Sequence, residues 1–243
     1  MNTLSKITVW LSLLIISLFS TSCMVNELMG VKGNRQVIDE IRTIDQHFET
    51  INVQQGIQVY LTQGDYTAIR VEADENLIDL LVTEVEKNQL KLYFEKNVYT
   101  AKARNVYITT ENVTGIHTSS GAALRTENTL QTDRLILSTS SGSSIKTHVN
   151  AKEVEMSSSS GSSAKLEGIT NSLTLRASSG SNIDANRLQT IDTYAKASSG
   201  ANIDLYVSGT LNAYASSGGN IRYEGKPNRV NKENSSGGKI SGK

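Results

Sequence analysis

Two aspartates one repeat apart are the side chains with the clearest potential for chemistry. Asp184 and Asp204 each lie four residues after the glycine of consecutive Ser-Ser-Gly motifs. If these motifs stack as neighbouring turns, the two carboxylates lie about 5 Å apart, which suits a retaining glycosidase or a bound cation. The same position in other repeats is often basic, at Arg125, Lys146, Lys165 and Arg222. A solvated face whose charges compensate one another is therefore the simpler interpretation.

The histidines and tyrosines form no catalytic set in the sequence. His47, His117 and His148 occupy unrelated positions in the repeat, so no Ser/His/Asp arrangement follows from their spacing. We predict no catalytic residue, cofactor or metal site. Outward tyrosines can stack on sugar rings, although they can also simply cover strands; the candidates are Tyr60, Tyr93, Tyr99, Tyr107, Tyr194, Tyr206 and Tyr214.

The only cysteine, Cys23, closes an N-terminal export signal. Lys6 precedes an apolar run at residues 7–19, which is too short to span a bilayer, and small residues at 20–22 lead into the cysteine. This order resembles the bacterial lipobox, in which the cysteine becomes the acylated N-terminus, although Ser20 stands where leucine is usual. We predict a lipoprotein signal peptide at residues 1–22 and membrane attachment through lipid on Cys23. The alternative is an ordinary signal peptide that leaves Cys23 free.

Charge and composition narrow the possible partners. The 24 acidic and 24 basic residues cancel, so the chain lacks the electrostatic footprint of a nucleic-acid-binding protein. After processing, no cysteine remains that could form an internal disulfide. A single proline in 243 residues favours long, uninterrupted strand ladders. Residues 23–36 lack sustained periodicity, and we predict that they form a tether.

A repeat over residues 112–243 must position the candidate side chains. Ser-Ser-Gly recurs about every 19 residues, with its glycines at Gly121, Gly142, Gly161, Gly180, Gly200, Gly218 and Gly237. Apolar or small residues recur five and seven positions before each glycine and one, three and five positions after it, which is one side of a strand. Stacking successive turns as parallel strands buries that side, so the sequence predicts a single-stranded parallel β-helix, or β-solenoid.

The same parity makes predictions about the Ser-Ser-Gly corner itself. The second serine of each motif and the small residue after the glycine should both point inward. The glycine should permit the bend and the close approach of neighbouring turns.

Residues 37–111 are predicted to be irregular N-terminal turns of the same β-helix domain, which spans 37–243. Apolar residues alternate with polar ones around Val59, and turns are expected near Gly56 and Gly64. Two interpretations of residues 75–88 are open, a helix of about 14 residues or a single helical turn followed by a strand. The β-branched segment at 80–86 favours the second interpretation.

Several segments resemble the head-domain (GIN) family of "putative autotransporter adhesins". They are residues 48–65, 71–77 and 90–93, with the motifs Ser-Gly-Ser-Asn-Ile at 179–183 and Ser-Gly-Ala-Asn-Ile at 199–203. The resemblance covers about residues 37–243. It implies a right-handed parallel β-helix in an envelope lipoprotein and carries over no catalytic residues.

Three functions stay open from the sequence. The absence of a catalytic constellation favours a non-catalytic cell-envelope lipoprotein, anchored in the outer membrane, that binds a glycan, a host surface or an envelope protein as an adhesin. The first alternative is a carbohydrate-active enzyme of the pectin-lyase-like type that acts through the face near Asp184 and Asp204. The second is a structural or signalling accessory without a ligand.

Overall fold

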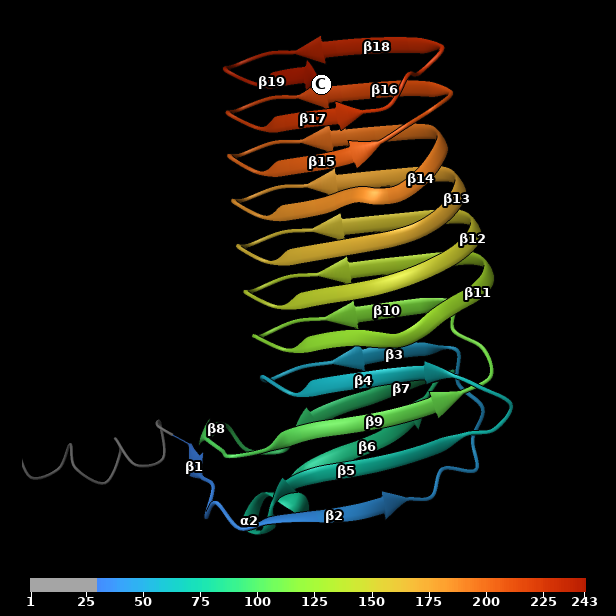
Figure 1. The fold of residues 1–243 in the computed structure, drawn as a ribbon. Coiled ribbons are helices and arrows are strands. Elements are labelled where there is room, and N and C mark those ends of the chain that lie inside the picture. The colour runs from blue at the N-terminus through green and yellow to red at the C-terminus, as the bar shows by residue number, and fades with distance from the viewer. Residues whose placement is uncertain (1–29) are drawn as a thin grey trace, which may run out of the picture.

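The computed structural model describes residues 30–243, which form a column built almost entirely of β-strands (Figure 1). Its regular part is a parallel β-solenoid of about 7 turns with ~19 residues per turn, which confirms the predicted fold class. The predicted signal peptide at 1–22 and Cys23 lie outside the described residues. Among the residues that are described, no helix has the length and apolar character needed to cross a bilayer.

Each regular turn passes through two sheets that face each other, either as two strands or as one long strand that bends between them. The strands are β10 (Gly115–Thr118), β11 (Ala123–Thr139), β12 (Ser144–Ser158), β13 (Ser163–Ala177), β14 (Asn182–Ala197), β15 (Asn202–Tyr206), β16 (Thr210–Ala215), β17 (Asn220–Glu224), β18 (Arg229–Asn234) and β19 (Lys239–Gly242). They pair in parallel, and the residues three positions after each glycine are direct partners, as the repeat predicts.

The N-terminal end of the column departs from this pattern. It comprises β1 (Val31–Lys32), β2 (Val37–Arg42), β3 (Thr50–Val53), β4 (Gln58–Gln63), β5 (Ala68–Asp74), α2 (Glu75–Ile78), β6 (Leu81–Glu86), β7 (Gln89–Phe94), β8 (Val98–Thr100) and β9 (Arg104–Thr110). The short α2 followed by β6 confirms the single helical turn and strand. β3 and β4 form a turn that stacks in parallel between β10–β11 and the later strands β7 and β9.

Antiparallel pairs close this end of the column, where the sequence predicts only irregular solenoid turns. β5 lies antiparallel between β2 and β9, and β6 pairs with β7 in the same way. Alternation of apolar residues is the same in parallel and antiparallel strands, so the pattern alone does not distinguish them. These strands form a cap on the regular turns.

Residues 30–36 belong to the folded cap, so the predicted tether at 23–36 is wrong for this part. β1 pairs with β8, and the fully buried Asp74 carboxylate accepts backbone hydrogen bonds from Arg35 at 2.8 Å and from Lys102 and Ala103 at 2.9 Å. Burial alone would raise the pKa of Asp74, but these hydrogen bonds lower it below its usual value. A two-residue strand held by a distant carboxylate leaves no periodic signal in the sequence.

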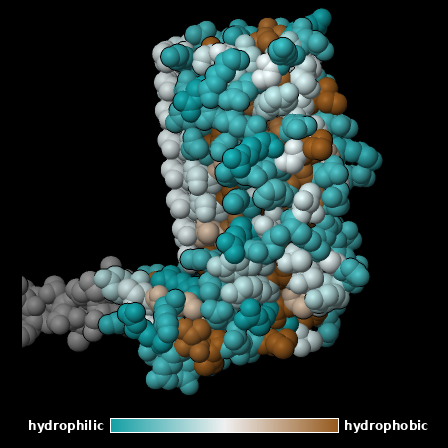
Figure 2. All heavy atoms as spheres, in the orientation of Figure 1, coloured by the Kyte–Doolittle hydropathy of each residue, from teal (hydrophilic) through white to brown (hydrophobic). Residues whose placement is uncertain are grey.

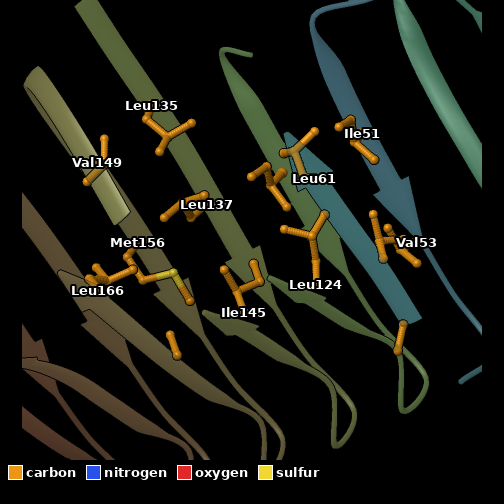
Figure 3. Packing of buried hydrophobic residues seen from close by; sticks show 14 of the residues in the cluster. Ile51, Val53, Leu61, Leu124, Leu135, Leu137, Ile145, Val149, Met156 and Leu166 are labelled. Carbon is orange, nitrogen blue, oxygen red and sulfur yellow. The ribbon is translucent and has the colours of Figure 1, made fainter. Parts of the chain in front are cut away.

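The apolar core runs the length of the column between the two sheets. Figure 3 shows side chains from successive turns meeting there, among them Leu124, Leu137 and Ile145. All three are at most 2% exposed, and they occupy positions that the repeat assigns to the core. Each turn buries its apolar face against the turns above and below it, so no turn has a separate core.

The Ser-Ser-Gly motifs form tight turns along one edge of the column, where Figure 2 shows a pale band. In the first corner, the Ala122 amide donates to the Ser119 carbonyl at 3.1 Å, and Ser120 and Gly121 have φ values of 51° and 74°. Positive φ at both central residues is the signature of a type I′ turn. The second serine is exposed in all seven corners, so its predicted inward position is wrong. The in-and-out alternation of a strand does not apply to the two corner residues, because both have positive φ.

The corners confirm one prediction about their small residues and correct another about their glycines. The residue after the glycine is buried in the first six corners, as at Ser162 and Ser181. A Cβ atom added at Gly121, Gly142 or Gly161 would meet no atom within 4 Å, so glycine serves the left-handed backbone there and not a close approach. The amides of the first six corner glycines also donate to the second-serine carbonyl of the next turn; for example, Gly121 donates to Ser141 at 3.0 Å.

Candidate functional site

One outward column of side chains runs the length of the structure and holds the two aspartates, the basic residues and two of the tyrosines singled out for chemistry. Backbone register places its members side by side on consecutive strands from β5 to β19. We call this set the charged column; it consists, in spatial order, of Arg70, Tyr107, Tyr60, Arg125, Lys146, Lys165, Asp184, Asp204, Arg222 and Ser241.

The two aspartates lie side by side as predicted, but they do not form a free carboxylate pair. Arg222 makes a bidentate contact with Asp204. Its Nε donates to Oδ1 at 2.5 Å, and its Nη2 donates to Oδ2 at 2.6 Å. Hydrogen bonding and charge attraction from Asp204 raise the pKa of Arg222. Asp184 accepts the Asn186 amide at 3.2 Å. Because Arg222 pairs with Asp204, a compensated face is the better interpretation. The described residues contain no group of three or more His, Cys, Asp or Glu side chains that could hold a metal ion.

The tyrosines of the charged column stack on one another. The rings of Tyr60 and Tyr107 lie 4.8 Å apart with an interplanar angle of 15°. Arg125 covers the other face of Tyr60 at 4.5 Å, and Arg70 covers the other face of Tyr107 at 3.9 Å. Both faces of both rings are therefore occupied. Sugar stacking on these two tyrosines, an option left by the sequence, conflicts with this geometry.

A shallow groove of about 430 Å³ runs beside the central part of the charged column, across β4 and β11 to β14. Its floor carries the small side chains of Ala123, Ser144 and Ser163, which lie two residues after their glycines, with Gln58 and Asn182 at the two ends. Because these residues are small, the longer basic side chains beside them form one wall of the groove.

That wall is formed by one basic residue from each of three successive turns, Arg125, Lys146 and Lys165. Arg125 lies 2.7 Å from the Glu127 carboxylate, and Lys165 lies 3.4 Å from Glu167. Lys146, between them, is exposed, and no carboxylate of residues 30–243 lies within 4.0 Å of its ammonium group. The groove thus presents one uncompensated cation flanked by two partly compensated ones.

The opposite sheet brings together a histidine and a serine that sequence spacing did not single out. His117 Nδ1 lies 2.6 Å from Ser138 Oγ, and burial lowers the pKa of His117. Both residues lie four positions before their glycines, a coincidence that an alignment on the repeat could have revealed. No described carboxylate lies within 4.0 Å of His117, and the strand amides on either side belong to the ladder. The pair therefore lacks both the orienting acid and the oxyanion donors of a hydrolase.

The remaining histidines lie beside glutamate carboxylates. His47 lies 3.3 Å from the Glu49 carboxylate, and His148 lies 2.8 Å from Glu167. Neither approaches a serine or an aspartate in a catalytic arrangement, so the histidines supply no nucleophile activation to the groove.

These features define a class of protein: a capped parallel β-solenoid that presents two long polar faces. A family model described as "Putative auto-transporter adhesin, head GIN domain" matches residues 47–227. The chain belongs to this family, which confirms the resemblance noted in the sequence. No curated protein matches the chain.

Several solved structures share the fold. A "putative adhesin" from Bacteroides fragilis NCTC 9343 superposes with a TM-score of 0.80 at 21% identity, covering 88% of this chain and 100% of that one. A "putative lipid binding protein" from Parabacteroides distasonis ATCC 8503 gives a TM-score of 0.71 at 18% identity, covering 88% and 99%. A "putative adhesin" from Parabacteroides merdae ATCC 43184 gives 0.68 at 18% identity, covering 88% and 98%. At these identities the likeness establishes the fold.

Proposed function

We propose that the protein is a non-catalytic, lipid-anchored cell-envelope adhesin that binds its ligand on an outer face of the solenoid. The observation that carries this proposal is a column whose two ends differ. Gly30, the first described residue, adjoins the cap, and Lys243 lies at the opposite end (Figure 1). A chain attached to a membrane through Cys23 would present the regular turns away from the attachment point. Membership of an adhesin-like family supports the same function.

The polar outer faces fit binding better than catalysis. Arg222 pairs with Asp204, one of the two outward aspartates, and the strand amides there are committed to the ladder. A preorganised site for developing charge needs donors that are free to point at it. A flat, rigid surface with repeated side chains is suited to recognising an extended partner.

Lipidation is tested by replacing the cysteine. Cys23→Ala should remove the acyl mass from the mature protein and shift it from the membrane fraction to the soluble fraction or to the unprocessed precursor. Cys23→Ser serves as a second variant that preserves size. An unchanged mass and unchanged membrane fractionation would show that Cys23 is not the anchor.

Surface display and adhesion are tested on intact cells. Added protease should degrade the protein on whole cells while a periplasmic marker survives, and deletion should reduce attachment to the cognate surface. Complementation by the wild-type gene should restore attachment, and complementation by the Cys23→Ala gene should not. Full protection from protease without permeabilisation would contradict an adhesin role.

A carbohydrate-active enzyme remains the second candidate because Asp184 and Asp204 are neighbours in register. The purified chain from residue 24 onwards would be incubated with a panel of polysaccharides. Release of reducing ends or unsaturated products, abolished by Asp184→Asn with Asp204→Asn, would favour the enzyme. If neither ligand binding nor turnover is found, a structural or signalling accessory is the function that fits.

A further inference from the structure

We propose that the groove beside Arg125, Lys146 and Lys165 binds an acidic polysaccharide, a chain of uronic acids lying along the column axis. This inference deepens the proposed function and rests on it, because it names the ligand class and the face. It involves no bond making or breaking.

The charge distribution fixes the sign and the extent of the ligand. Three basic side chains follow one another on β11, β12 and β13, and the Lys146 ammonium has no carboxylate partner within 4.0 Å in the described chain. The next position of the charged column is Asp184, which also lines the groove and repels an anion. An anionic ligand is therefore attracted along three turns of the solenoid and repelled at the fourth.

The polar character of the groove favours a polysaccharide over a peptide. The cations of the wall recur at the interval of neighbouring strands, about 4.8 Å along the axis. A polyuronate carries a carboxylate on every ring, and its rings also carry hydroxyl groups. An extended acidic peptide carries carboxylates without such hydroxyl groups, so the groove floor is what separates the two ligands.

The groove floor suits sugar hydroxyls. Ser144 and Ser163 contribute hydroxyl groups, and Gln58 and Asn182 contribute amides at the two ends. Each of these groups can both donate and accept hydrogen bonds. The nearby rings of Tyr60 and Tyr107 have both faces covered, so recognition here rests on charge and hydrogen bonds and not on stacking. An acidic sugar polymer fits this combination better than a neutral one.

Binding of the purified chain from residue 24 onwards would be measured by titration calorimetry with polygalacturonate. Its methyl ester is the matched neutral polymer, and poly(dT) and phosphatidylserine vesicles are alternative polyanions. Lys146→Gln should weaken polygalacturonate binding about two- to five-fold, and Lys146→Gln with Lys165→Gln about five- to twenty-fold, the range expected for exposed ion pairs. Lys196→Gln, the same charge change on the opposite sheet, is the control and should leave the affinity unchanged.

A gain of affinity makes the test independent of impaired folding. Asp184→Asn removes the repelling charge and keeps an oxygen that can accept the Asn186 amide, so it should tighten binding about two- to five-fold. Binding should weaken with added salt, and the methyl ester should bind at least ten-fold more weakly than the acid, on the order expected when three ion pairs are lost.

Each outcome decides the inference. The stated losses with Lys146→Gln and the gain with Asp184→Asn support it. Equal affinity for poly(dT) or the vesicles, equal affinity for the methyl ester, an equal loss with Lys196→Gln, or no binding to polygalacturonate overturns it. Failure here with retained attachment of cells would leave the adhesin function standing and place its ligand elsewhere. Loss of surface display would remove the proposed function itself.

Discussion

Two glycines of the same solenoid turn, Gly161 and Gly168, should respond very differently to the same substitution. Gly161 occupies a Ser-Ser-Gly corner with φ of 69°, where an added Cβ would meet nothing within 4 Å. Gly168 lies within β13 with φ of 121°, where the added Cβ would stand 2.0 Å from the Val149 carbonyl oxygen. The repeat draws attention to Gly161, whereas the steric environment makes Gly168 the more sensitive position.

The magnitudes follow from backbone strain and contact. Gly161→Ala puts a side chain in the left-handed region, at about 1–2 kcal/mol, partly offset by about 0.4–1 kcal/mol from a less flexible unfolded chain. Its net effect should be about 1 kcal/mol of lost stability. Gly168→Ala adds a strained φ at about 1–3 kcal/mol to the displacement of the β12 backbone at about 1–3 kcal/mol. We expect a loss of about 3–5 kcal/mol.

Urea unfolding of the wild type, both variants and Gly142→Ala would measure these differences. Far-UV circular dichroism reports the strands, and tyrosine fluorescence reports the stacked rings, since the only tryptophan, Trp10, lies in the predicted signal peptide. Coincident transitions are needed because stacked repeats can unfold in parts. A Gly161→Ala midpoint as low as that of Gly168→Ala would refute the reasoning.

Substitutions at three further positions test the corners and the cap. Ser160→Asn should raise the free energy of unfolding by about 0.5–1 kcal/mol, because asparagine tolerates the left-handed region better than serine, whereas an inward position would give a loss. Ser162→Ala should cost about 1 kcal/mol by removing the hydrogen bond to the Thr139 carbonyl, and Ser162→Val about 1–3 kcal/mol by overpacking the narrow corner, both measured by urea unfolding. Asp74→Ala should cost about 3 kcal/mol or more at neutral pH because one buried amide and two partly buried amides lose their acceptor. The pKa of Asp74 is lowered in the folded state, so its contribution is complete above about pH 4 and is lost as pH falls through the lower folded value; a difference between variant and wild type that stays constant down to pH 2 would contradict this.

The regular turns were predictable because their signal is periodic. Leu124, Ile145 and Ile183 lie three residues after their glycines, and parallel stacking is the simplest way to bury such a series. The adjacency of Asp184 and Asp204 follows from the same alignment. Hence the register of the charged column over the repeat could be obtained from the sequence.

The corners and the cap were less predictable for separate physical reasons. The second serines face outward because they are the first of two left-handed turn residues, to which strand alternation does not apply. A serine in the sequence gives no sign that its φ is positive. In the cap, β3 and β4 stack between strands from different parts of the chain, a choice set by three-dimensional packing. The stacking of Tyr60 on Tyr107 depends on that same choice, because 47 residues separate them in a part of the chain without a repeat.

The hydrogen bonds along the Ser-Ser-Gly edge allow the column to be longer or shorter by whole turns. Every corner glycine amide donates to the corner that follows it, from Gly121 to Gly218, so each turn offers the same donor and acceptor to its neighbours. Adding or removing one whole turn would preserve these backbone hydrogen bonds on both sides, and each turn changes the height by about 4.8 Å. The number of turns can therefore act as a ruler that sets how far a binding surface reaches, independently of how the cap is built.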